Sequence, residues 1–284
     1  MLQVTSISEL RQWRNQCNGK RIAFVPTMGN LHEGHLALVR EAKKQADVVV
    51  VSIFVNPLQF AANEDLASYP RTPEDDASAL IKEGVDLLFR PGVDEMYPRG
   101  RDAQTIVEVP VLSNVLCGAS RPHFFRGVTT VVCRLFNLVQ PHVTVFGKKD
   151  YQQLMVIRLM TEDLGLPIEV VGVDTVREAD GLAMSSRNNY LDESQRQQAI
   201  ELYRILTAIQ DCLLEKGEYQ SACEQAALLQ LAQAGFRPDY ISVRRQSDLA
   251  VPQADDTALV VLAAGWLGKT RLIDNLEVNL NLAG

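Results

Sequence analysis

The chain lacks a long hydrophobic segment. No window of its 284 residues approaches eighteen consecutive apolar residues, the length at which a transmembrane helix becomes a candidate. The first twenty residues, Met1 to Lys20, alternate polar and apolar side chains and contain no apolar signal-peptide core. We therefore expect no association with a membrane.

Cysteine pairs at a metal-binding or redox spacing are also missing. The five cysteines are odd in number and nowhere form a Cys-x-x-Cys pair. A disulfide framework or a zinc knuckle is therefore not indicated. A protein of the reducing cytoplasm fits this cysteine usage.

The sequence has no run of basic residues, no internal repeat and no low-complexity segment. Its 28 Lys and Arg stand against 35 Asp and Glu, which gives a net charge of −7. Without a continuous basic track for a phosphate backbone, nucleic acid is not an expected partner. The 46% hydrophobic and 22% charged residues are typical of a globular chain and exclude disorder and fibres.

Short β-branched runs alternate with helical patterns along the first two-thirds of the chain. Near-continuous apolar runs are typical of strands buried on both faces of a parallel sheet. They predict five strands, at Arg21–Pro26, Val48–Val55, Val85–Phe89, His142–Phe146 and Pro167–Val171. Helices are predicted between them at Gly34–Gln45, Pro73–Glu83, Thr129–Val139 and Asp150–Leu164. This alternation predicts an α/β fold, a Rossmann-like parallel sheet wound by helices.

The pattern changes after Arg187. Two helices are predicted at Glu193–Glu215 and Ser221–Ala234, followed by strands at Tyr240–Arg245, Ala258–Ala264 and Arg271–Leu276. This order indicates a smaller C-terminal α+β domain. The polar stretch Val176–Leu191 contains the turn signals Asp180-Gly181 and Asn188-Asn189, and we expect two domains, residues 1–178 and 179–284.

The most informative segment runs from Pro26 to His35, directly after the first strand and into the next helix. In an open α/β sheet this is the carboxyl edge, where ligands bind. Gly29 and Gly34 allow close backbone approach, and a helix start offers unpaired N–H groups to an anion. His32 and His35 can both donate hydrogen bonds to a polyphosphate as charge builds on it. The alternative is a pair of partly buried structural histidines, but the strand–glycine–helix context favours phosphate binding.

Two other strand ends carry polar side chains to the same edge of the sheet. The segment Gly147–Gln153 puts Lys149 within reach of phosphates, while Asp150 is a good candidate for a helix N-cap. The dipeptide Asn56-Pro57 could simply form a turn. Gln59, just beyond it, presents a neutral donor and acceptor at the ligand edge.

For two further segments, taken alone, the residues favour a structural explanation. The sequence Ser185–Arg187 places two hydroxyls beside a forked cation, which suits phosphate oxygens, but it is also typical of a solvated loop. Thr72-Pro73 is typical of a helix start, where Asp75 and Asp76 complement the helix dipole. One of these acids could instead hold a magnesium ion carried by a nucleotide, because Mg²⁺ commonly uses one or two carboxylates.

Together these motifs resemble the pantothenate synthetase family, also called the pantoate–β-alanine ligases. The resemblance covers essentially the whole chain, and the motifs occur in the family's order. They are Pro26-Thr27-Met28-Gly29 followed by His32 and His35, Asn56 to Phe60, Tyr69 to Thr72, Arg126-Gly127-Val128, Gly147 with Lys149 to Gln153, and Ser185 to Asn188. Their joint occurrence is specific, whereas the two histidines alone would indicate only the wider nucleotidyltransferase superfamily.

The resemblance implies an ATP-dependent ligase that condenses pantoate with β-alanine through a pantoyl adenylate, with release of pyrophosphate and AMP. ATP and Mg²⁺, pantoate and β-alanine would be its small-molecule partners, and the family forms homodimers. Residues 1–178 would bind the nucleotide and pantoate, and residues 179–284 would form a lid.

The family pattern also assigns roles to individual residues. Catalysis at the triphosphate would rest on His32, His35, Lys149, Ser185, Ser186 and Arg187. The ATP site would comprise Met28, His35, Gly147, Lys149, Asp150, Val176, Met184, Ser185, Ser186 and Arg187. Met28, Asn56, Gln59 and Gln153 would contact pantoate, with Met28 as a wall against its geminal methyl groups. Asp75 would approach the magnesium ion.

Four positions depart from the family pattern. Cys117 and Lys148 stand where the family favours Glu, Ser68 stands where it favours Arg, and His123 is displaced by one position. The missing Glu at 117 removes an expected salt-bridge partner, and the shifted histidine changes which way the side chain of this loop points. The triphosphate and pantoate residues are intact, so activity is expected.

Two other functions would use part of the same motif set. A cytidylyl- or adenylyltransferase would share the histidine pair, but it would not call for paired glutamines at Gln59 and Gln153. A non-catalytic nucleotide sensor is disfavoured by the intact Lys149 and Ser185–Arg187. A tRNA synthetase is disfavoured by the acidic balance and by the lack of a region large enough for anticodon recognition.

Overall fold

The computed structural model describes residues 1–61, 66–216, 219 and 221–280. The chain divides into two compact units. The N-terminal unit comprises Met1–Lys148 and Gln153–Asp174, and the C-terminal unit comprises Lys149–Gln152 and Thr175–Gly284. The chain thus passes finally from the N-terminal to the C-terminal unit between residues 174 and 175. The boundary expected from the sequence lies between residues 178 and 179.

The N-terminal unit is built on a six-stranded parallel sheet, which confirms the predicted fold class. Its strands, in spatial order, are β1 (Leu2–Val4), β4 (Leu87–Phe89), β3 (Val48–Ile53), β2 (Ile22–Thr27), β5 (Val143–Gly147) and β6 (Glu169–Val173). The five predicted strands are all present. The edge strand β1 was not predicted, because three residues are too few to show a pattern.

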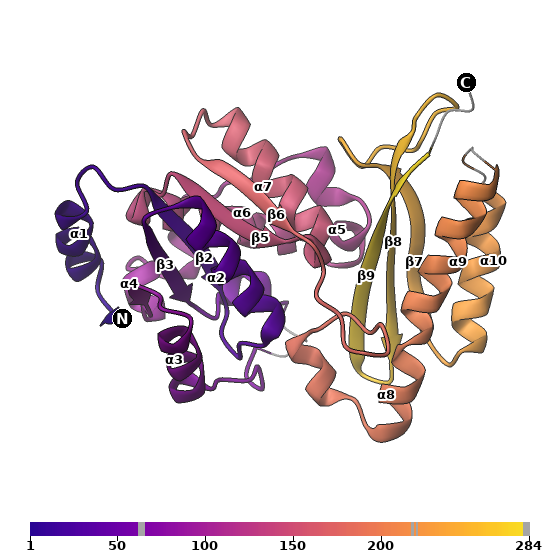
Figure 1. Ribbon diagram of the computed structural model, residues 1–284, viewed down its shortest axis with the longest axis horizontal. Coiled ribbons are helices and arrows are strands. Elements are labelled where there is room, and N and C mark those ends of the chain that lie inside the picture. The colour runs from indigo at the N-terminus through magenta and orange to yellow at the C-terminus, as the bar shows by residue number, and fades with distance from the viewer. Residues whose placement is uncertain (62–65, 217–218, 220, 281–284) are drawn as a thin grey trace. The chain divides into compact units, whose positions relative to one another are not determined.

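Helices cover both faces of this sheet (Figure 1). One face packs against α2 (Glu33–Gln45) and α3 (Pro73–Lys82) through fully buried side chains such as Val51 and Leu80. On the other face Phe24 of β2 meets Phe136 of α6 (Phe124–Val139), with ring centroids 6.4 Å apart. Because both faces are buried, the strands are apolar throughout, as predicted.

Two helical stretches differ from the sequence prediction. The helix α1 (Ile7–Gln16) was not predicted, although Ser6 and Glu9 form a capping box at its start. The helix α6 begins at Phe124 rather than Thr129 and includes Gly127 as its fourth residue. A Cβ at Gly127 would lie 2.2 Å from the carbonyl oxygen of Leu58, so glycine here permits close packing rather than ending the helix.

The remaining elements of this part of the chain are short, apart from one long helix. They are η1 (Pro57–Gln59), α4 (Val93–Met96), η2 (Arg101–Ala103), η3 (Val111–Asn114), α5 (Cys117–Ser120), η4 (Lys148–Asp150) and the long helix α7 (Tyr151–Asp163). The helix α7 packs against β6, where Gly172 leaves room for Leu154.

The strand order of the sheet reverses between β2 and β5. From β2 the chain proceeds through β3 and β4 to one side, and from β5 it proceeds to β6 on the other side. The segments that leave two such neighbouring strands diverge and open a crevice at their carboxyl ends. The segments after β2, β3 and β5 all reach this edge, so the topology places the candidate ligand residues of the N-terminal unit at the switch point.

The C-terminal unit is a three-stranded antiparallel sheet packed against helices (Figure 1). Its elements are η5 (Ser186–Tyr190), α8 (Glu193–Ala199), α9 (Glu201–Lys216), α10 (Ser221–Gln233), β7 (Arg237–Arg245), β8 (Ala258–Leu267) and β9 (Thr270–Asn279). Leu206, Leu231 and Val261 are fully buried in its core. The predicted single helix Glu193–Glu215 is interrupted at Ile200, whose N–H donates to the Gln198 carbonyl rather than continuing the helical ladder.

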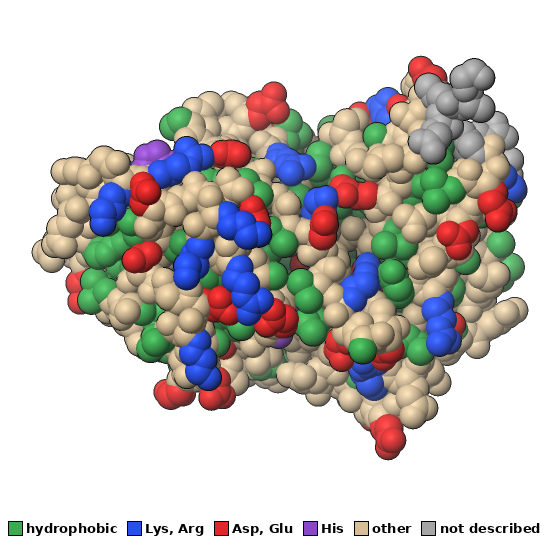
Figure 2. Space-filling view, viewed as in Figure 1, with side chains coloured by type: hydrophobic (Ala, Val, Ile, Leu, Met, Phe, Trp, Pro, Cys, Tyr) green, Lys and Arg blue, Asp and Glu red, His purple; other side chains and the backbone are tan. Residues whose placement is uncertain are grey.

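Charged side chains of both signs lie next to one another on the face drawn in Figure 2. Among the ion pairs of the N-terminal unit, Arg40 of α2 pairs with both Glu33 and Glu83, and Lys44 pairs with Glu41. Such exposed pairs contribute little to stability, about 0–1 kcal/mol each. In the described part of the chain, no helix combines the length and the apolar character needed to cross a membrane.

Candidate functional site

The two histidines after β2 cap the helix that they open. His32 is the N-cap of α2, and its Nδ1 accepts the N–H of Gly34 at 3.2 Å. The Nδ1 of His35 accepts the N–H of His32 at 3.3 Å, and the two ring centroids lie 4.1 Å apart. The two rings therefore take the places that Ser and Glu occupy in an ordinary capping box.

This capping fixes the tautomer of both rings. An imidazole nitrogen that accepts a hydrogen bond carries no proton, so the proton of each neutral ring resides on Nε2. Both histidines thus present an N–H donor from the far side of the ring. The structural and the functional interpretations of the pair are compatible, because they use different nitrogens.

The loop between β2 and His32 is held by a buried carboxylate. Asp76 of α3, 3% exposed, accepts the N–H of Asn30 at 2.9 Å and the N–H of Leu31 at 2.8 Å. Gly29 has φ +83°, and a Cβ there would lie 3.0 Å from the same carboxylate. The loop that carries Met28, itself half-buried, is therefore fixed by a residue 46 positions away in sequence.

The neighbouring acid, Asp75, is exposed in the first turn of α3. Asp76, by contrast, accepts hydrogen bonds from the loop after β2 and a further one from the Thr72 hydroxyl at 3.1 Å. Among the described residues no group of three His, Cys, Asp or Glu side chains could enclose a metal ion. A Mg²⁺ bound by one carboxylate, with phosphate and water as its other ligands, fits this donor set.

A polar cluster follows β3. Asn56 is 1% exposed, and its Nδ2 donates to Gln59 Oε1 at 2.8 Å and to the carbonyl of Gly127 at 3.1 Å. Its Oδ1 accepts the N–H of Leu58 at 3.2 Å and the hydroxyl of Tyr97 at 2.7 Å. The Asn56 amide, expected to contact pantoate, thus has four hydrogen bonds inside the protein. Gln59, in η1, is 9% exposed.

Tyr97 and the role of Gly127 in this cluster were not predicted from the sequence. Tyr97 follows α4, 41 residues after Asn56, and nothing in its local sequence connects it with η1. Gly127 was recognised only as part of a family motif. Its missing side chain is what brings the α6 backbone up against Leu58 and puts its own carbonyl within reach of Asn56.

The segment after β5 contains several predicted ligand residues. Gly147 ends β5, Lys149 and Asp150 lie half-buried in η4, and Gln153 is the third residue of α7. The expected N-cap of α7, Asp150, is the last residue of a 3₁₀ turn that leads into the helix. Its carboxylate lies 3.9 Å from the Lys149 ammonium.

In the C-terminal unit, residues 176–184 form a hairpin-like loop. The N–H of Met184 donates to the carbonyl of Val176, and the N–H of Glu178 donates to that of Leu182. Gly181 at the turn has φ +95°, and a Cβ there would meet the Tyr203 ring at 2.5 Å. Val176 and Met184, two predicted ATP contacts, are therefore paired across this loop.

The Ser-Ser-Arg segment continues from that loop as a capped turn. Ser185 is the N-cap of η5, and its Oγ accepts the N–H of Arg187 at 3.3 Å. Ser186 is 8% exposed, and Arg187 is half-buried. The Asn188 amide donates to the Ala183 carbonyl at 3.1 Å, which ties the turn to the hairpin. The segment is ordered by its own hydrogen bonds, unlike a simple solvated loop.

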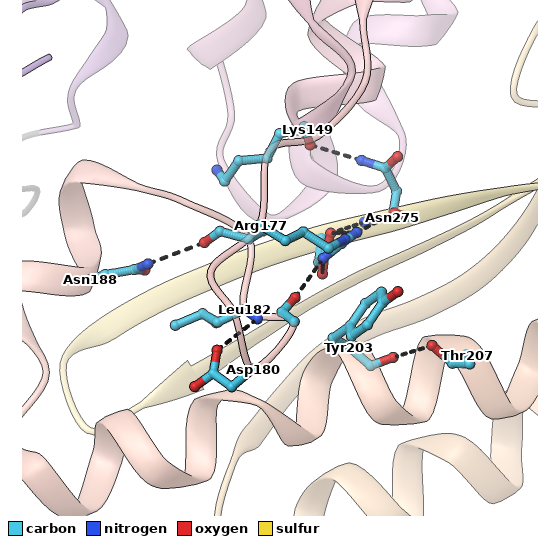
Figure 3. A network of polar contacts seen from close by, with 11 residues as sticks. Lys149, Arg177, Asp180, Leu182, Asn188, Tyr203, Thr207 and Asn275 are labelled. Carbon is cyan, nitrogen blue, oxygen red and sulfur yellow. Dashed lines mark hydrogen bonds and ion pairs between the residues drawn. The ribbon is translucent and has the colours of Figure 1, made fainter. Parts of the chain in front are cut away.

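A buried ion pair supports this region (Figure 3). Arg177 donates to both carboxylate oxygens of Asp274 on β9, at 2.6 and 2.9 Å, and its guanidinium stacks on Tyr203 at 4.0 Å from the ring centroid. The Asp274 side chain is 2% exposed. The next residue, Asn275, donates to the carbonyl of Lys149 at 2.8 Å. Adjacent residues of β9 thus hold both Lys149 and the loop that leads to Ser185.

Two of the family departures have local explanations. Cys117 is 8% exposed in α5, so a glutamate there would be buried rather than paired at the surface. The Arg121 guanidinium lies 3.7 Å from the centroid of the Phe124 ring and donates to the carbonyl of Gln59 at 3.2 Å. Lys148 pairs with Asp174 at 2.8 Å.

Comparison with known families matches residues 2–277 to the family described as Pantoate-beta-alanine ligase. The chain belongs to the pantoate–β-alanine ligase family. It is therefore an enzyme, a ligase that joins pantoate to β-alanine. The resemblance inferred from its motifs is confirmed.

Relatives and solved structures match nearly the whole chain. The pantothenate synthetase of Shewanella loihica is 59% identical over 270 residues, 95% of each chain, and that of Idiomarina loihiensis is 57% identical over 273 residues, 96% of each chain. The crystal structure of pantothenate synthetase from Thermus thermophilus has a TM-score of 0.92 at 47% identity, covering 98% of this chain and 100% of that chain.

A more distant ligase structure was solved with ligands. The pantoate–β-alanine ligase of Francisella tularensis, complexed with beta-gamma ATP and β-alanine, has a TM-score of 0.83 at 32% identity. The match covers 97% of each chain. The fold that this chain adopts is thus one on which a pantoate–β-alanine ligase binds those two compounds.

Proposed function

We propose that the ligase works in two steps through a pantoyl adenylate. The pantoate carboxylate attacks the α-phosphorus of ATP, and the bond to the bridging oxygen breaks to release pyrophosphate. The amine of β-alanine then attacks the acyl carbon, and AMP leaves with the pair of electrons of the broken C–O bond. A carboxylate is a poor electrophile toward an amine, so activation must precede amide formation.

The observation that best supports this proposal is the capped histidine pair at the switch point of the sheet. His32 and His35 each accept a backbone N–H at Nδ1, so on each neutral ring the N–H donor is at Nε2. Preorganised donors of this kind stabilise charge that develops on a phosphoryl group. In the proposed site they act on the triphosphate together with Lys149, Ser185, Ser186 and Arg187. The nucleotide would also be contacted by Met28, Gly147, Asp150, Val176 and Met184.

Pantoate would be held by neutral groups. Gln59 and Gln153 follow β3 and β5, the two strands that flank β2 in the sheet. Uncharged amides bind a carboxylate without strongly lowering its nucleophilicity, as a fixed cation would. Met28, in the loop after β2, would provide the apolar wall for the geminal methyl groups.

The remaining parts of the proposal rest on the family resemblance. Mg²⁺ would bind at Asp75 and neutralise charge on the phosphates, with phosphate and water completing its shell. A homodimer and a cytoplasmic location stay predictions. The N-terminal unit would carry the nucleotide and pantoate sites, and the C-terminal unit would act as a lid.

Exchange of labelled pyrophosphate into ATP tests the first step. The exchange should require pantoate and Mg²⁺ but not β-alanine, because the adenylate forms before the amine is needed. Exchange that continues without pantoate, or that requires β-alanine, would contradict the proposed order.

A further inference from the structure

Two main-chain groups that hydrogen-bond to the Asn56 amide determine the orientation of the neighbouring Gln59 amide. At one end of the Asn56 amide, Oδ1 receives the N–H of Leu58, which can only donate. At the other end, Nδ2 faces the carbonyl of Gly127, which can only accept. Since both main-chain groups have a fixed polarity, the Asn56 amide can take only one orientation.

The orientation of the Asn56 amide determines which atoms of Gln59 and Tyr97 donate and which accept. The Nδ2 atom is a donor, so the atom of Gln59 that lies 2.8 Å away must be its oxygen. The Oδ1 atom is an acceptor, so the Tyr97 hydroxyl at 2.7 Å must donate. Burial raises the pKa of the Tyr97 hydroxyl, so the proton that it donates stays in place well above neutral pH.

We infer that Asn56 and Tyr97 are positioning residues that turn the Gln59 amide so that its NH₂ group, and not its oxygen, is presented to the substrate. Oε1 is bonded to Asn56 and Nε2 has no hydrogen-bond partner among the residues that the structure describes, so Nε2 is the atom that remains for a ligand. The recognised group must then be a hydrogen-bond acceptor, such as a carboxylate or hydroxyl oxygen. This inference rests on the proposed function, in which Gln59 contacts pantoate.

The surrounding packing makes the arrangement rigid. Tyr97 is 2% exposed and its ring packs against Phe54 of the β3 end, with centroids 6.0 Å apart. The carbonyl of Gln59 accepts a hydrogen bond from Arg121, and its N–H donates to the carbonyl of Asn56. A buried amide with four hydrogen bonds reorients only if several of them break together, so Asn56 holds Gln59 in one orientation.

The polarity is tested by comparing Gln59→Glu with Gln59→Ala in the full-length protein. Glu keeps an oxygen for Asn56 but replaces the NH₂ group with a second oxygen, which would face the substrate's acceptor. Gln59→Ala should raise the KM for pantoate about 10- to 100-fold, and Gln59→Glu should raise it further, by at least about 100-fold. Neither substitution should change the KM for ATP more than about 2-fold. A Glu variant that uses pantoate as well as wild type would overturn the assigned polarity.

The relay, by which the Tyr97 hydroxyl positions Gln59 through Asn56, is tested by Tyr97→Phe. This substitution removes the hydroxyl and keeps the ring. We expect the KM for pantoate to rise about 3- to 10-fold, with little change in the KM for ATP. In a Gln59→Ala background the same change should have an effect of less than about 2-fold, because Tyr97 acts through Gln59. Equal effects in both backgrounds would show that the hydroxyl is merely structural.

One outcome separates this inference from the proposed function. If Gln59→Ala left the KM for pantoate unchanged, the assignment of Gln59 to the pantoate site would fail, and the positioning role would fall with it. If Gln59→Ala behaved as expected while Tyr97→Phe had the same effect in both backgrounds, the pantoate site would stand and only the relay would be overturned.

Discussion

The two units hold their candidate ligand residues with different kinds of interaction. In the N-terminal unit the groups around the switch point are imidazoles and amides bonded to the main chain, together with one buried carboxylate that also accepts backbone N–H groups. In the C-terminal unit the loop before Ser185 closes through its own main-chain hydrogen bonds and is held in addition by ion pairs, Arg177 with Asp274 and Arg196 with Glu178 and Asp180.

The difference bears on what each unit can do. Main-chain hydrogen bonds have fixed direction and polarity, so they preorganise donors with little dependence on salt. Ion pairs hold a loop through charge, so their contribution changes with protonation and, where they are exposed, with ionic strength. Substitutions near the switch point should therefore affect the kinetics of substrate use most, whereas substitutions in the C-terminal network should affect stability most.

The largest effect is expected from Asp274→Asn in the C-terminal unit. The change leaves the Arg177 guanidinium, 17% exposed, without a counter-charge, and breaking a buried pair in this way costs about 3–5 kcal/mol. Denaturant unfolding should show the loss. Glu201→Gln, which breaks the exposed pair with Arg204 in the same unit, is the matched control and should cost about 0–1 kcal/mol. An equal loss of unfolding free energy in the two variants would mean that burial does not make the Arg177–Asp274 pair more important for stability than the Arg204–Glu201 pair.

Near the switch point, His32→Asn should separate capping from phosphate binding. Asn is a good N-cap, so the free energy of unfolding should change by less than about 0.5 kcal/mol. The side chain no longer reaches the position of Nε2, so pyrophosphate exchange should slow about 10²- to 10³-fold, or about 3–4 kcal/mol. His32→Ala should lose the cap as well, at a further cost of about 1 kcal/mol in stability. A wild-type exchange rate in the Asn variant would make the histidine purely structural.

The adjacent acids Asp75 and Asp76 offer a third comparison. Asp76→Asn puts an NH₂ group against one of the two loop N–H groups, so unfolding should become easier by about 1–3 kcal/mol. Exchange activity should also fall, because the loop that carries Met28 loosens. Asp75→Asn should leave stability within about 0.5 kcal/mol of wild type and raise the Mg²⁺ concentration needed for half-maximal exchange. If Asp75→Asn destabilised the protein and Asp76→Asn changed only the Mg²⁺ requirement, the two carboxylates would have the opposite roles.

The smallest effect concerns Asp180. Its hydrogen bond with Arg196 lowers the pKa of the carboxyl below its ordinary value. A lowered pKa contributes stability above about pH 4, and this contribution is lost as the pH falls through the folded-state pKa. Because the residue is exposed, Asp180→Asn should cost at most about 1 kcal/mol at neutral pH, less at high salt. A difference from wild type that persisted unchanged at acidic pH would contradict this assignment.

Much of the fold could be predicted because local sequence dictates it. Strands buried on both faces must be apolar, and the strands β2, β3 and β5 stood out for that reason. The loop residues at their ends followed from the geometry of a parallel sheet, which brings all the carboxyl ends to one edge. The family resemblance then supplied the roles of these residues, which residue chemistry alone left open.

The contacts that position those residues could not be predicted. Asp76 looked like a helix-dipole residue or a metal ligand, and its bonds to Asn30 and Leu31 arise only when α3 packs beside the β2 loop. Tyr97 gave no signal because its partner lies 41 residues earlier in the chain. Long-range hydrogen bonds depend on packing that no local pattern encodes.

The central claim is that pantoate attacks the α-phosphorus of ATP, and isotope transfer tests it most directly. Pantoate labelled with ¹⁸O in its carboxylate is converted to product with unlabelled ATP, and the released nucleotide and phosphates are analysed by mass spectrometry. Attack at the α-phosphorus leaves one carboxylate oxygen on the phosphate of AMP, so AMP should carry one ¹⁸O atom and pyrophosphate none. Unlabelled AMP, or label in inorganic phosphate formed together with ADP, would contradict the account.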